Sequence, residues 1–207
     1  MIKRKNTGQI IVISAPSGAG KGTVIAELLK NDNKSRWLSV SATSRAMREG
    51  EKEGVNYFYK SREEFESMIK NNELLEYATY NENYYGTPKA YVDSKIDEGK
   101  NVILEIEVQG AMQVKKLVPD AVMIFIAPES KEILRARLTG RGTEEADVIA
   151  DRIAIAEKEL RACLMYDYIT VNKQGEAAEC AKDILAIVRA EAVKKGNMFG
   201  AVSDFIL

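Results

Sequence analysis

A glycine-rich segment near the N-terminus, APSGAGKGT at residues 15–23, holds residue types that can bind phosphate. Backbone N–H groups that curl before a helix bind an anion when glycines occupy the tight positions and a lysine reaches the outer phosphates. Gly18, Gly20 and Lys21 meet this requirement. Ala15 and Gly22 depart from the pattern G-x-x-x-x-G-K-[ST], and an alanine is tolerated at position 15 if its φ is negative. The segment predicts a nucleotide site with an altered loop.

The strand and helix around this segment favour a nucleotide site over the alternative, a glycine-rich turn with a surface lysine. QIIVIS at residues 9–14 has the β-branched content of a buried strand, and the apolar spacing from Thr23 to Leu29 is helical. Thr23 follows the lysine one place later than the usual hydroxyl, so we expect it in the first helical turn, near the phosphates.

Two carboxylates follow a second apolar run, NVILEIEV at residues 101–108. Side chains alternate along a strand, so Glu105 and Glu107 are expected on one face near its C-terminal end, where ligands collect in open α/β sheets. Carboxylates there can hold Mg²⁺ through water or accept hydrogen bonds from a substrate. The alternative is a solvated acidic pair, and the preceding glycine-rich loop favours the functional interpretation.

The composition excludes several classes of protein. The chain of 207 residues has 30 Lys and Arg against 31 Asp and Glu, so no basic field indicates nucleic acid or an anionic membrane. The absence of histidine excludes Ser-His, Cys-His and His-metal chemistry. The start of the sequence lacks the apolar core of a signal peptide, and the two cysteines show no metal-binding or redox spacing. These two observations predict a cytoplasmic protein.

Apolar runs alternate with helical patterns, as expected for a parallel α/β sheet. Further strands are expected at 121–128 and 166–172, with helices at 109–118 and 176–195. Two segments interrupt the alternation. Residues 39–87 combine short strands, tyrosines and a helix that begins at a capping box of Ser61 and Glu64, and Pro88 is expected as the first residue of the next helix. Residues 129–165 are expected to form two helices around the loop TGRGTEE.

Six segments, in the order APSGAGKGT, SATSRAMREGEKEGVNYF, NNELLEYATYNENYYGT, EIEVQGA, RLTGRGTE and YDYITVN, resemble those of guanylate kinases. The resemblance covers residues 9–192 and is more specific than the loop alone. It implies one P-loop NTPase-type domain with a three-layer parallel sheet core at 1–38, 88–128 and 166–207, a mixed α+β GMP-binding insert at 39–87 and a helical lid at 129–165. It also implies transfer of the γ-phosphoryl group of ATP to GMP or dGMP, giving ADP and GDP.

The resemblance assigns a role to each matching position. It places ATP on the loop residues Ala15, Pro16, Ser17, Gly18, Ala19, Gly20, Lys21, Gly22 and Thr23, with Asn172 on the adenine side. It places the GMP phosphate on Arg45, Arg48, Tyr57 and Tyr85, and adds Glu51, Glu105 and Glu107 to the GMP site. Glu76 would accept from the two guanine N–H donors while Ser41 and Thr87 donate to O6. Lys21, Arg45 and the lid residues Arg137, Arg141 and Arg152 would stabilise the transferred group.

The phosphoryl transfer needs no histidine, because the phosphate of GMP is largely dianionic near pH 7 and needs no general base. Mg²⁺ would be held mainly by nucleotide phosphates and water, near Thr23 and Glu105. The expected partners are ATP and GMP, with no nucleic acid and no membrane, and the oligomeric state stays open.

Three alternatives remain from the sequence. One is a non-catalytic guanylate-kinase-like domain that binds phosphopeptides, which the intact loop disfavours. Another is a P-loop kinase with a different acceptor, against which Ser41, Glu76 and Thr87 argue together. The third is a nucleotide-binding regulator without turnover.

Overall fold

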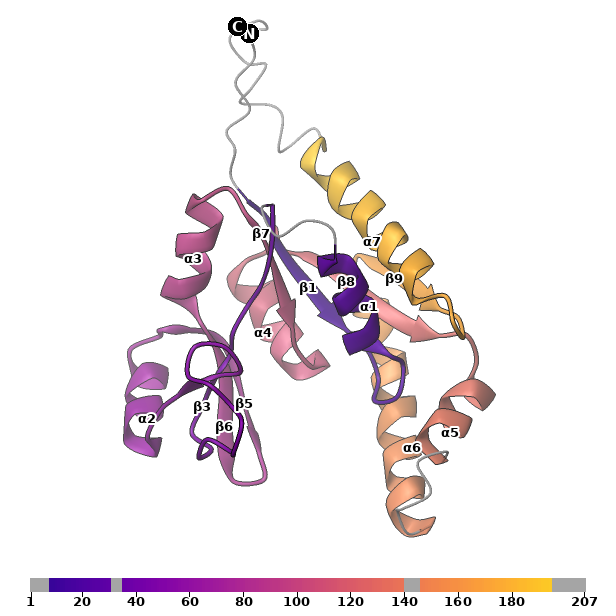
Figure 1. Ribbon diagram of the computed structural model, residues 1–207, viewed down its shortest axis with the longest axis horizontal. Helices are drawn as coiled ribbons and strands as arrows, with labels where there is room; N and C mark the ends of the chain where they lie inside the picture. The colour runs from indigo at the N-terminus through magenta and orange to yellow at the C-terminus, as the bar shows by residue number, and fades with distance from the viewer. Residues whose placement is uncertain (1–7, 31–34, 140–145, 195–207) are drawn as a thin grey trace, which may run out of the picture. The chain divides into compact units, whose positions relative to one another are not determined.

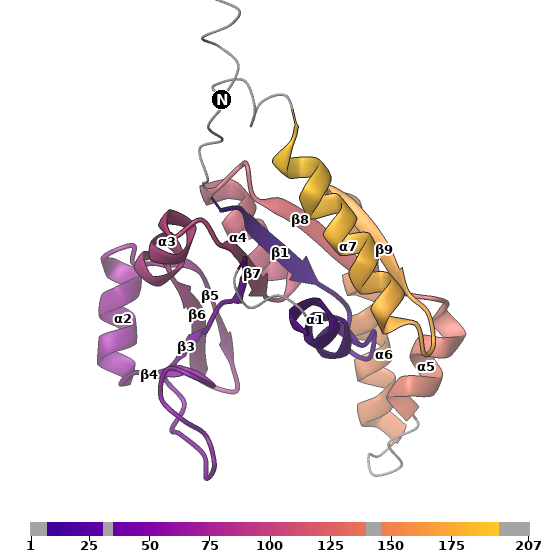
Figure 2. The same cartoon turned by 45° about the horizontal axis from the view of Figure 1, so that its top comes forward.

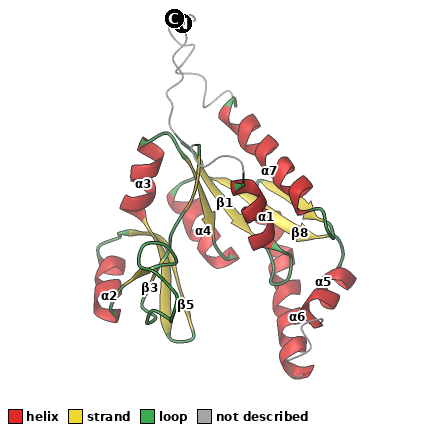
Figure 3. Ribbon diagram, viewed as in Figure 1, coloured by secondary structure: helices red, strands yellow, loops and turns green. Residues whose placement is uncertain are grey.

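The computed structural model describes residues 8–30, 35–139 and 146–194, without the side chains of 146–149. In chain order the elements are β1 (Ile10–Ser14), α1 (Lys21–Leu29), β2 (Arg36–Leu38), β3 (Ala42–Thr43), β4 (Phe58–Tyr59), α2 (Arg62–Lys70), β5 (Leu74–Tyr80), β6 (Asn83–Pro88), α3 (Lys89–Asp97), β7 (Asn101–Glu105), α4 (Val108–Leu117), β8 (Val122–Pro128), α5 (Lys131–Thr139), α6 (Ala146–Arg161), the 3-10 helix η1 (Ala162–Met165), β9 (Tyr168–Asn172) and α7 (Ala177–Ala192). Figure 3 shows the helices and strands of this mixed α/β chain.

The larger sheet has five strands in the order β2-β7-β1-β8-β9, and its β2–β7 and β8–β9 pairs are parallel. Sequence neighbours such as β1 and β2 are not adjacent in this order, so helices carry the chain between strands. The apolar runs predicted as strands supply its buried residues, among them Ile13, Leu104 and Phe125. The expected P-loop-type α/β core is confirmed.

The chain divides into two compact units, which are described separately. The first unit comprises the described residues of 13–33 and 122–207, and the second those of 7–12 and 34–121. This division differs from the expected one into core, insert and lid, which stays a prediction.

In the first unit, α1 and α7 lie side by side, and α7 packs on β9 (Figure 1). The helices α5 and α6 lie side by side (Figure 2). Leu134, Leu138 and Ala156 form an apolar cluster between them. Ser130, the residue before α5, caps the start of this helix, because its Oγ accepts a hydrogen bond from the amide of Ile133. The helices expected in the segment 129–165 are therefore present.

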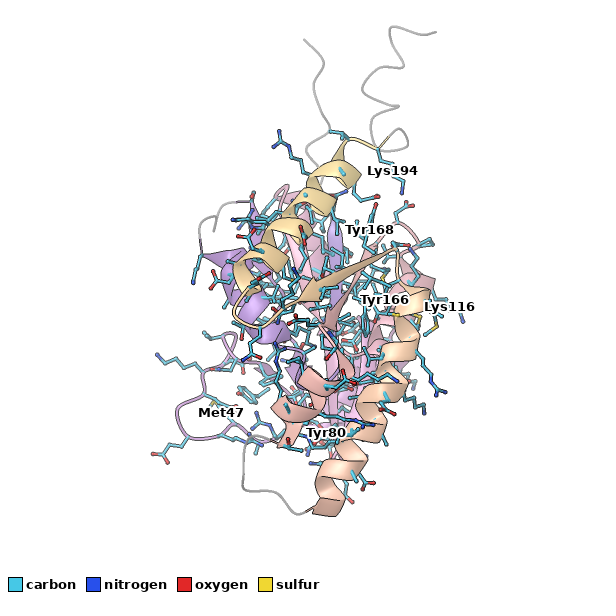
Figure 4. The ribbon with its side chains drawn as sticks, turned by 90° about the vertical axis from the view of Figure 1, so that its right-hand side faces the viewer. Met47, Tyr80, Lys116, Tyr166, Tyr168 and Lys194 are labelled. Atoms are coloured by element: carbon cyan, nitrogen blue, oxygen red, sulfur yellow. The ribbon has the colours of Figure 1, made fainter. Side chains whose placement is uncertain are left out.

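The start of β9 lies near the C-terminal end of α7, where Figure 4 labels Tyr168 and Lys194. The hydroxyl of Tyr168 donates to Glu191 Oε1, which ties the two elements together. Within the described ranges, no helix combines the length and apolarity needed to cross a bilayer.

In the second unit, a four-stranded sheet has the order β4-β3-β6-β5, with β5 and β6 as an antiparallel hairpin. Phe65 of α2 is buried against this sheet with Ala42 and Leu74. The predicted capping box is confirmed: the amide of Glu64 donates to Ser61 Oγ, and the amide of Ser61 donates to the Glu64 carboxylate.

Two expected boundaries are wrong. The strand expected over 101–108 ends at Glu105, because Glu107 is the N-cap of α4 and the helix begins at Val108. The alternation that placed Glu105 and Glu107 on one strand face therefore does not apply. Pro88 is the last residue of β6 and the N-cap of α3, one place before its expected position.

Candidate active site

The phosphate-binding loop lies between β1 and α1 in the first unit. Gly18 and Gly20 both have φ of 84°, in the left-handed region that glycine reaches without strain. Ala15 is not one of the positive-φ residues in the described part of the chain, so its methyl group is accommodated as expected. The altered motif therefore keeps glycine at the two positions where the backbone requires it.

The first turn of α1 is suited to an anion. Lys21 is the first residue of α1. The N-cap residue of this helix makes no side-chain cap hydrogen bond, and the first turn of the helix holds no acidic residue. The N–H groups of a first helical turn carry partial positive charge and have no partner within the helix. A Cβ on Gly22 would meet nothing within 4 Å, and the side chain of Thr23 is exposed.

Two predicted lid arginines reach the loop from α5 and α6. Arg137 Nη1 donates to the carbonyl of Ala19 at 3.3 Å, and Arg152 Nη2 donates to Ser17 Oγ at 3.3 Å. Arg135 instead pairs with Glu157 of α6 at 2.9 Å. Arg135 and Arg137 of α5 therefore contact different partners. Arg141 lies outside the described residues.

Asn172 holds the same loop from the end of β9. Its Nδ2 donates to the carbonyl of Ala19 at 2.7 Å, and the side chain is buried. A Cβ on Gly20 would lie 2.5 Å from that Nδ2, so glycine is also needed there for space. The sequence analysis predicted Asn172 on the adenine side of the ATP site, and it did not predict the hydrogen bond from Asn172 to Ala19.

A pocket of about 670 Å³ opens beside the loop in the first unit. Its lining includes Gly18, Gly20, Thr23, Arg137 and Asn172. This volume is in the range of small-molecule sites. Loop glycines, an arginine and the exposed turn after β9 can therefore surround the phosphates and base of one nucleotide.

In the second unit, Arg45 and three tyrosines form a cationic aromatic cluster. The Arg45 guanidinium carbon lies 5.5 Å from the ring centre of Tyr57 and 6.0 Å from that of Tyr59. Tyr57 also contacts Tyr85 edge-on, with ring centres 5.9 Å apart. A guanidinium beside hydroxyl-bearing rings is suited to a phosphate dianion.

Glu51 is hydrogen-bonded to Arg45 of this cluster and to the backbone of Arg48. Arg45 Nη2 donates to both carboxylate oxygens, at 2.8 and 3.0 Å, and the amide of Arg48 donates to Oε2 at 2.8 Å. The hydrogen bond from Arg45, followed by those from Arg48 and Tyr59, lowers the pKa of Glu51 to about 2. Glu51, expected in the GMP site, thus holds arginines with both of its oxygens.

A buried carboxylate lies near the open end of the β5–β6 hairpin. Glu76 is 6% exposed and is paired in register with Thr87, whose Oγ1 donates to Glu76 Oε1 at 2.6 Å. Burial raises the pKa of Glu76, the bond from Thr87 opposes that shift, and the charge of Glu107 adds to it. The two predicted base-reading residues therefore meet, while Ser41, also expected there, is half-buried at the start of β3.

The two strand-end acids lie near different parts of this unit. The charge of Glu107 acts on Glu76, and that of Glu105 acts on Tyr57, whose pKa is raised mainly by burial. Both carboxylates are exposed. Within the described residues, no group of three or more acidic or thiol side chains is arranged to hold a metal ion.

Gly110 in the first turns of α4 leaves room for the Glu76 side chain. A Cβ at this position would lie 2.5 Å from Glu76 Oε2 and 3.1 Å from its Cδ. The sequence did not single out Gly110, because nothing local shows which side chain approaches it.

Replacing Gly110 with alanine is expected to displace the Glu76 carboxylate. Overpacking of this kind costs about 1–3 kcal/mol, so we expect a lower unfolding midpoint and a KM for a guanine nucleotide raised roughly tenfold. Urea denaturation and initial-rate kinetics measure the two effects. Gln109→Ala on the same helix is the control, since Gln109 is exposed. An unchanged KM in Gly110→Ala would show that this close approach does not shape the site.

Fold and site together define a P-loop nucleotide phosphotransferase, with a phosphate loop in one unit and a buried carboxylate beside an arginine–tyrosine cluster in the other. A family profile described as guanylate kinase matches residues 7–190. The chain belongs to the guanylate kinase family.

Individual relatives agree over nearly the whole chain. The guanylate kinase of Shouchella clausii is 48% identical over 203 residues, which are 98% of each chain. That of Halalkalibacterium halodurans is 51% identical over 194 residues, 94% of each chain. A crystal structure of guanylate kinase from Anaplasma phagocytophilum superposes with a TM-score of 0.71 at 34% identity, covering 95% of this chain and 96% of that one.

Proposed function

We propose that the protein carries out the reaction of its family with the residues described above, passing the γ-phosphoryl group of ATP to GMP and giving ADP and GDP. Family membership makes the chain an ATP:GMP phosphotransferase. The buried Glu76 carboxylate is the observation that carries the choice of acceptor, because it can accept from the adjacent N1–H and N2–H donors of guanine. Adenine presents a ring-nitrogen acceptor there and would leave Glu76 Oε2 without a donor from the base.

The loop of the first unit binds ATP in this proposal. The amides of the first turn of α1 hold the phosphates, and Lys21 neutralises charge on the oxygens of the transferred group. Arg137 and Arg152 start from hydrogen bonds to loop atoms and shift to the phosphates when ATP is present. Asn172 keeps the loop in shape through Ala19.

The second unit binds GMP. Arg45, Arg48, Tyr57 and Tyr85 hold the phosphate, and Glu51 fixes the guanidinium of Arg45 and the backbone at Arg48. Thr87 orients Glu76 by donating to Oε1, which leaves Oε2 for guanine. Ser41 donates to O6, Glu107 lies on the base side and Glu105 on the phosphate side.

Mg²⁺ fits the chemistry of the loop as a companion of ATP. Mg²⁺ usually keeps several waters and binds phosphates rather than an all-protein cage. The hydroxyl of Thr23 lies in the first turn of α1 and lines the pocket, so it is the loop group that could approach the ion. When bound, the ion would reduce the negative charge of the phosphates. Use of dGMP and a cytoplasmic location stay predictions.

Product analysis tests the proposal. ATP, MgCl₂ and GMP are incubated with the protein, and nucleotides are separated by ion-exchange chromatography. Equal formation of ADP and GDP, lost when EDTA is in excess over MgCl₂, is the expected result. ADP without GDP would mean hydrolysis in place of transfer and would contradict the proposal.

A further inference from the structure

We infer that Tyr59 is a positioning residue for the acceptor phosphate, acting through Glu51 on the guanidinium of Arg45 and on the backbone of Arg48. This inference rests on the proposed GMP site and adds a residue that the sequence motifs did not include. The strand β4 explains its placement. Side chains alternate along a strand, so Tyr57 and Tyr59 share one face while Phe58 packs on the other against Tyr91, with ring centres 4.8 Å apart.

The Tyr59 hydroxyl completes the coordination of one carboxylate oxygen. It donates to Glu51 Oε2 at 2.8 Å, and the same oxygen accepts from Arg45 Nη2 and from the amide of Arg48. Glu51 Oε1 accepts only from Arg45 among the hydrogen bonds of the described residues. Three donors from different parts of the loop and strand thus fix the orientation of the Glu51 carboxylate.

The orientation of Glu51 sets the direction of the Arg45 guanidinium. Nη2 donates to Glu51 and Nη1 donates to the carbonyl of Ala46 at 2.7 Å. Because a guanidinium has five N–H groups in one plane, these bonds limit the N–H groups that Arg45 can offer to a phosphate to those of Nε and Nη1, close to Tyr85. If the Glu51 carboxylate rotated, the guanidinium would rotate with it, and these N–H groups would point in another direction.

A tyrosine hydroxyl suits this task because it donates without adding charge. A lysine or arginine at position 59 would compete with Arg45 for Glu51, whereas phenylalanine would keep the ring contacts and lose the donor. The Tyr59 ring packs edge-on against Tyr57, with centres 6.0 Å apart. The ring and the hydroxyl therefore have separable roles, and Tyr59→Phe removes only the second.

The test is Tyr59→Phe, measured with GMP and with guanosine. Loss of one hydrogen bond to the carboxylate predicts a KM for GMP raised about threefold to tenfold, with kcat and the KM for ATP within about twofold of the parent. Guanosine has no phosphate, so its inhibition constant should be unchanged. Tyr80→Phe, at an exposed position in the same unit, is the matched control.

Glu51→Gln supplies the second arm. If Tyr59 acts through Glu51, adding Tyr59→Phe to Glu51→Gln should raise the KM for GMP by less than it does in the parent. An unchanged KM in Tyr59→Phe, equal weakening of GMP and guanosine, or full additivity in the double variant would each overturn the inference. Failure of the proposed function can be distinguished from failure of this inference, because the parent protein itself would then form no GDP.

Discussion

Replacing Lys21 with alanine is expected to lower kcat for GDP formation by on the order of a hundredfold to a thousandfold, the usual effect of removing one donor to a developing negative charge. Lys21 is the first residue of α1, directly after the left-handed Gly20. Its ammonium is therefore placed where the outer phosphates of ATP reach the helix. Because the residues proposed to bind GMP lie in the other unit, affinity for GMP should change by less than about twofold.

Stopped assays over long times and calorimetric titration with GMP measure these two quantities for Lys21→Ala. Lys182→Ala is the matched control, since Lys182 is 68% exposed and pairs only with Glu179 among the ion pairs of the described chain. A Lys21→Ala protein that keeps most of its turnover would contradict the role given to the loop.

Replacing Glu76 with glutamine is expected to have the second large effect, a loss of kcat/KM for GMP. Glutamine keeps an oxygen for Thr87 but presents an N–H₂ group or a weaker acceptor to guanine. Hydrogen bonds to a charged group contribute about 1.5–3 kcal/mol, so kcat/KM for GMP should fall roughly 10- to 150-fold. The KM for ATP should stay within about twofold. Equal losses for both substrates would mean that Glu76 serves the fold rather than the guanine site.

The same variant should be more stable than the parent at neutral and alkaline pH. Burial raises the pKa of Glu76 above its ordinary value, so the folded parent favours the protonated carboxyl. The parent therefore loses stability as the pH rises through that raised pKa, and a neutral glutamine does not. The difference in urea midpoint should be largest near pH 8 and should shrink toward pH ~4.3, the ordinary glutamate value. A difference independent of pH would contradict this assignment.

Local features of the fold were predictable from the sequence. The strands around Ile13 and Phe125 are apolar enough to be recognised, and the Ser61–Glu64 capping box is a contact within four residues. The left-handed Gly18 and Gly20 follow from the motif, because only a backbone requirement explains glycine at that spacing.

Contacts between distant segments were not predictable in the same way. Tyr59 is one of nine tyrosines, and no motif in the sequence indicates that its hydroxyl contacts Glu51. The contact becomes visible only when the strand β4 is placed. Asn172 meets Ala19, a residue 153 positions away. The prediction for Glu107 was wrong because an N-cap residue has the extended backbone of a strand, so the sequence did not show where the strand ended and the helix began. Gly110 could not be separated from an ordinary helical glycine before its approach to Glu76 was seen.

We propose that the second unit selects guanine through Glu76 while the loop of the first unit binds ATP, the donor of the phosphoryl group. ADP formation from ATP with GMP, AMP, UMP or CMP, compared in parallel for the parent and Glu76→Gln, tests it most directly. The predicted result is strong turnover of the parent with GMP alone and a selective loss of that turnover in the variant. Comparable turnover of the parent with another of the four acceptors, or a variant that still discriminates for GMP as strongly as the parent, would contradict the claim.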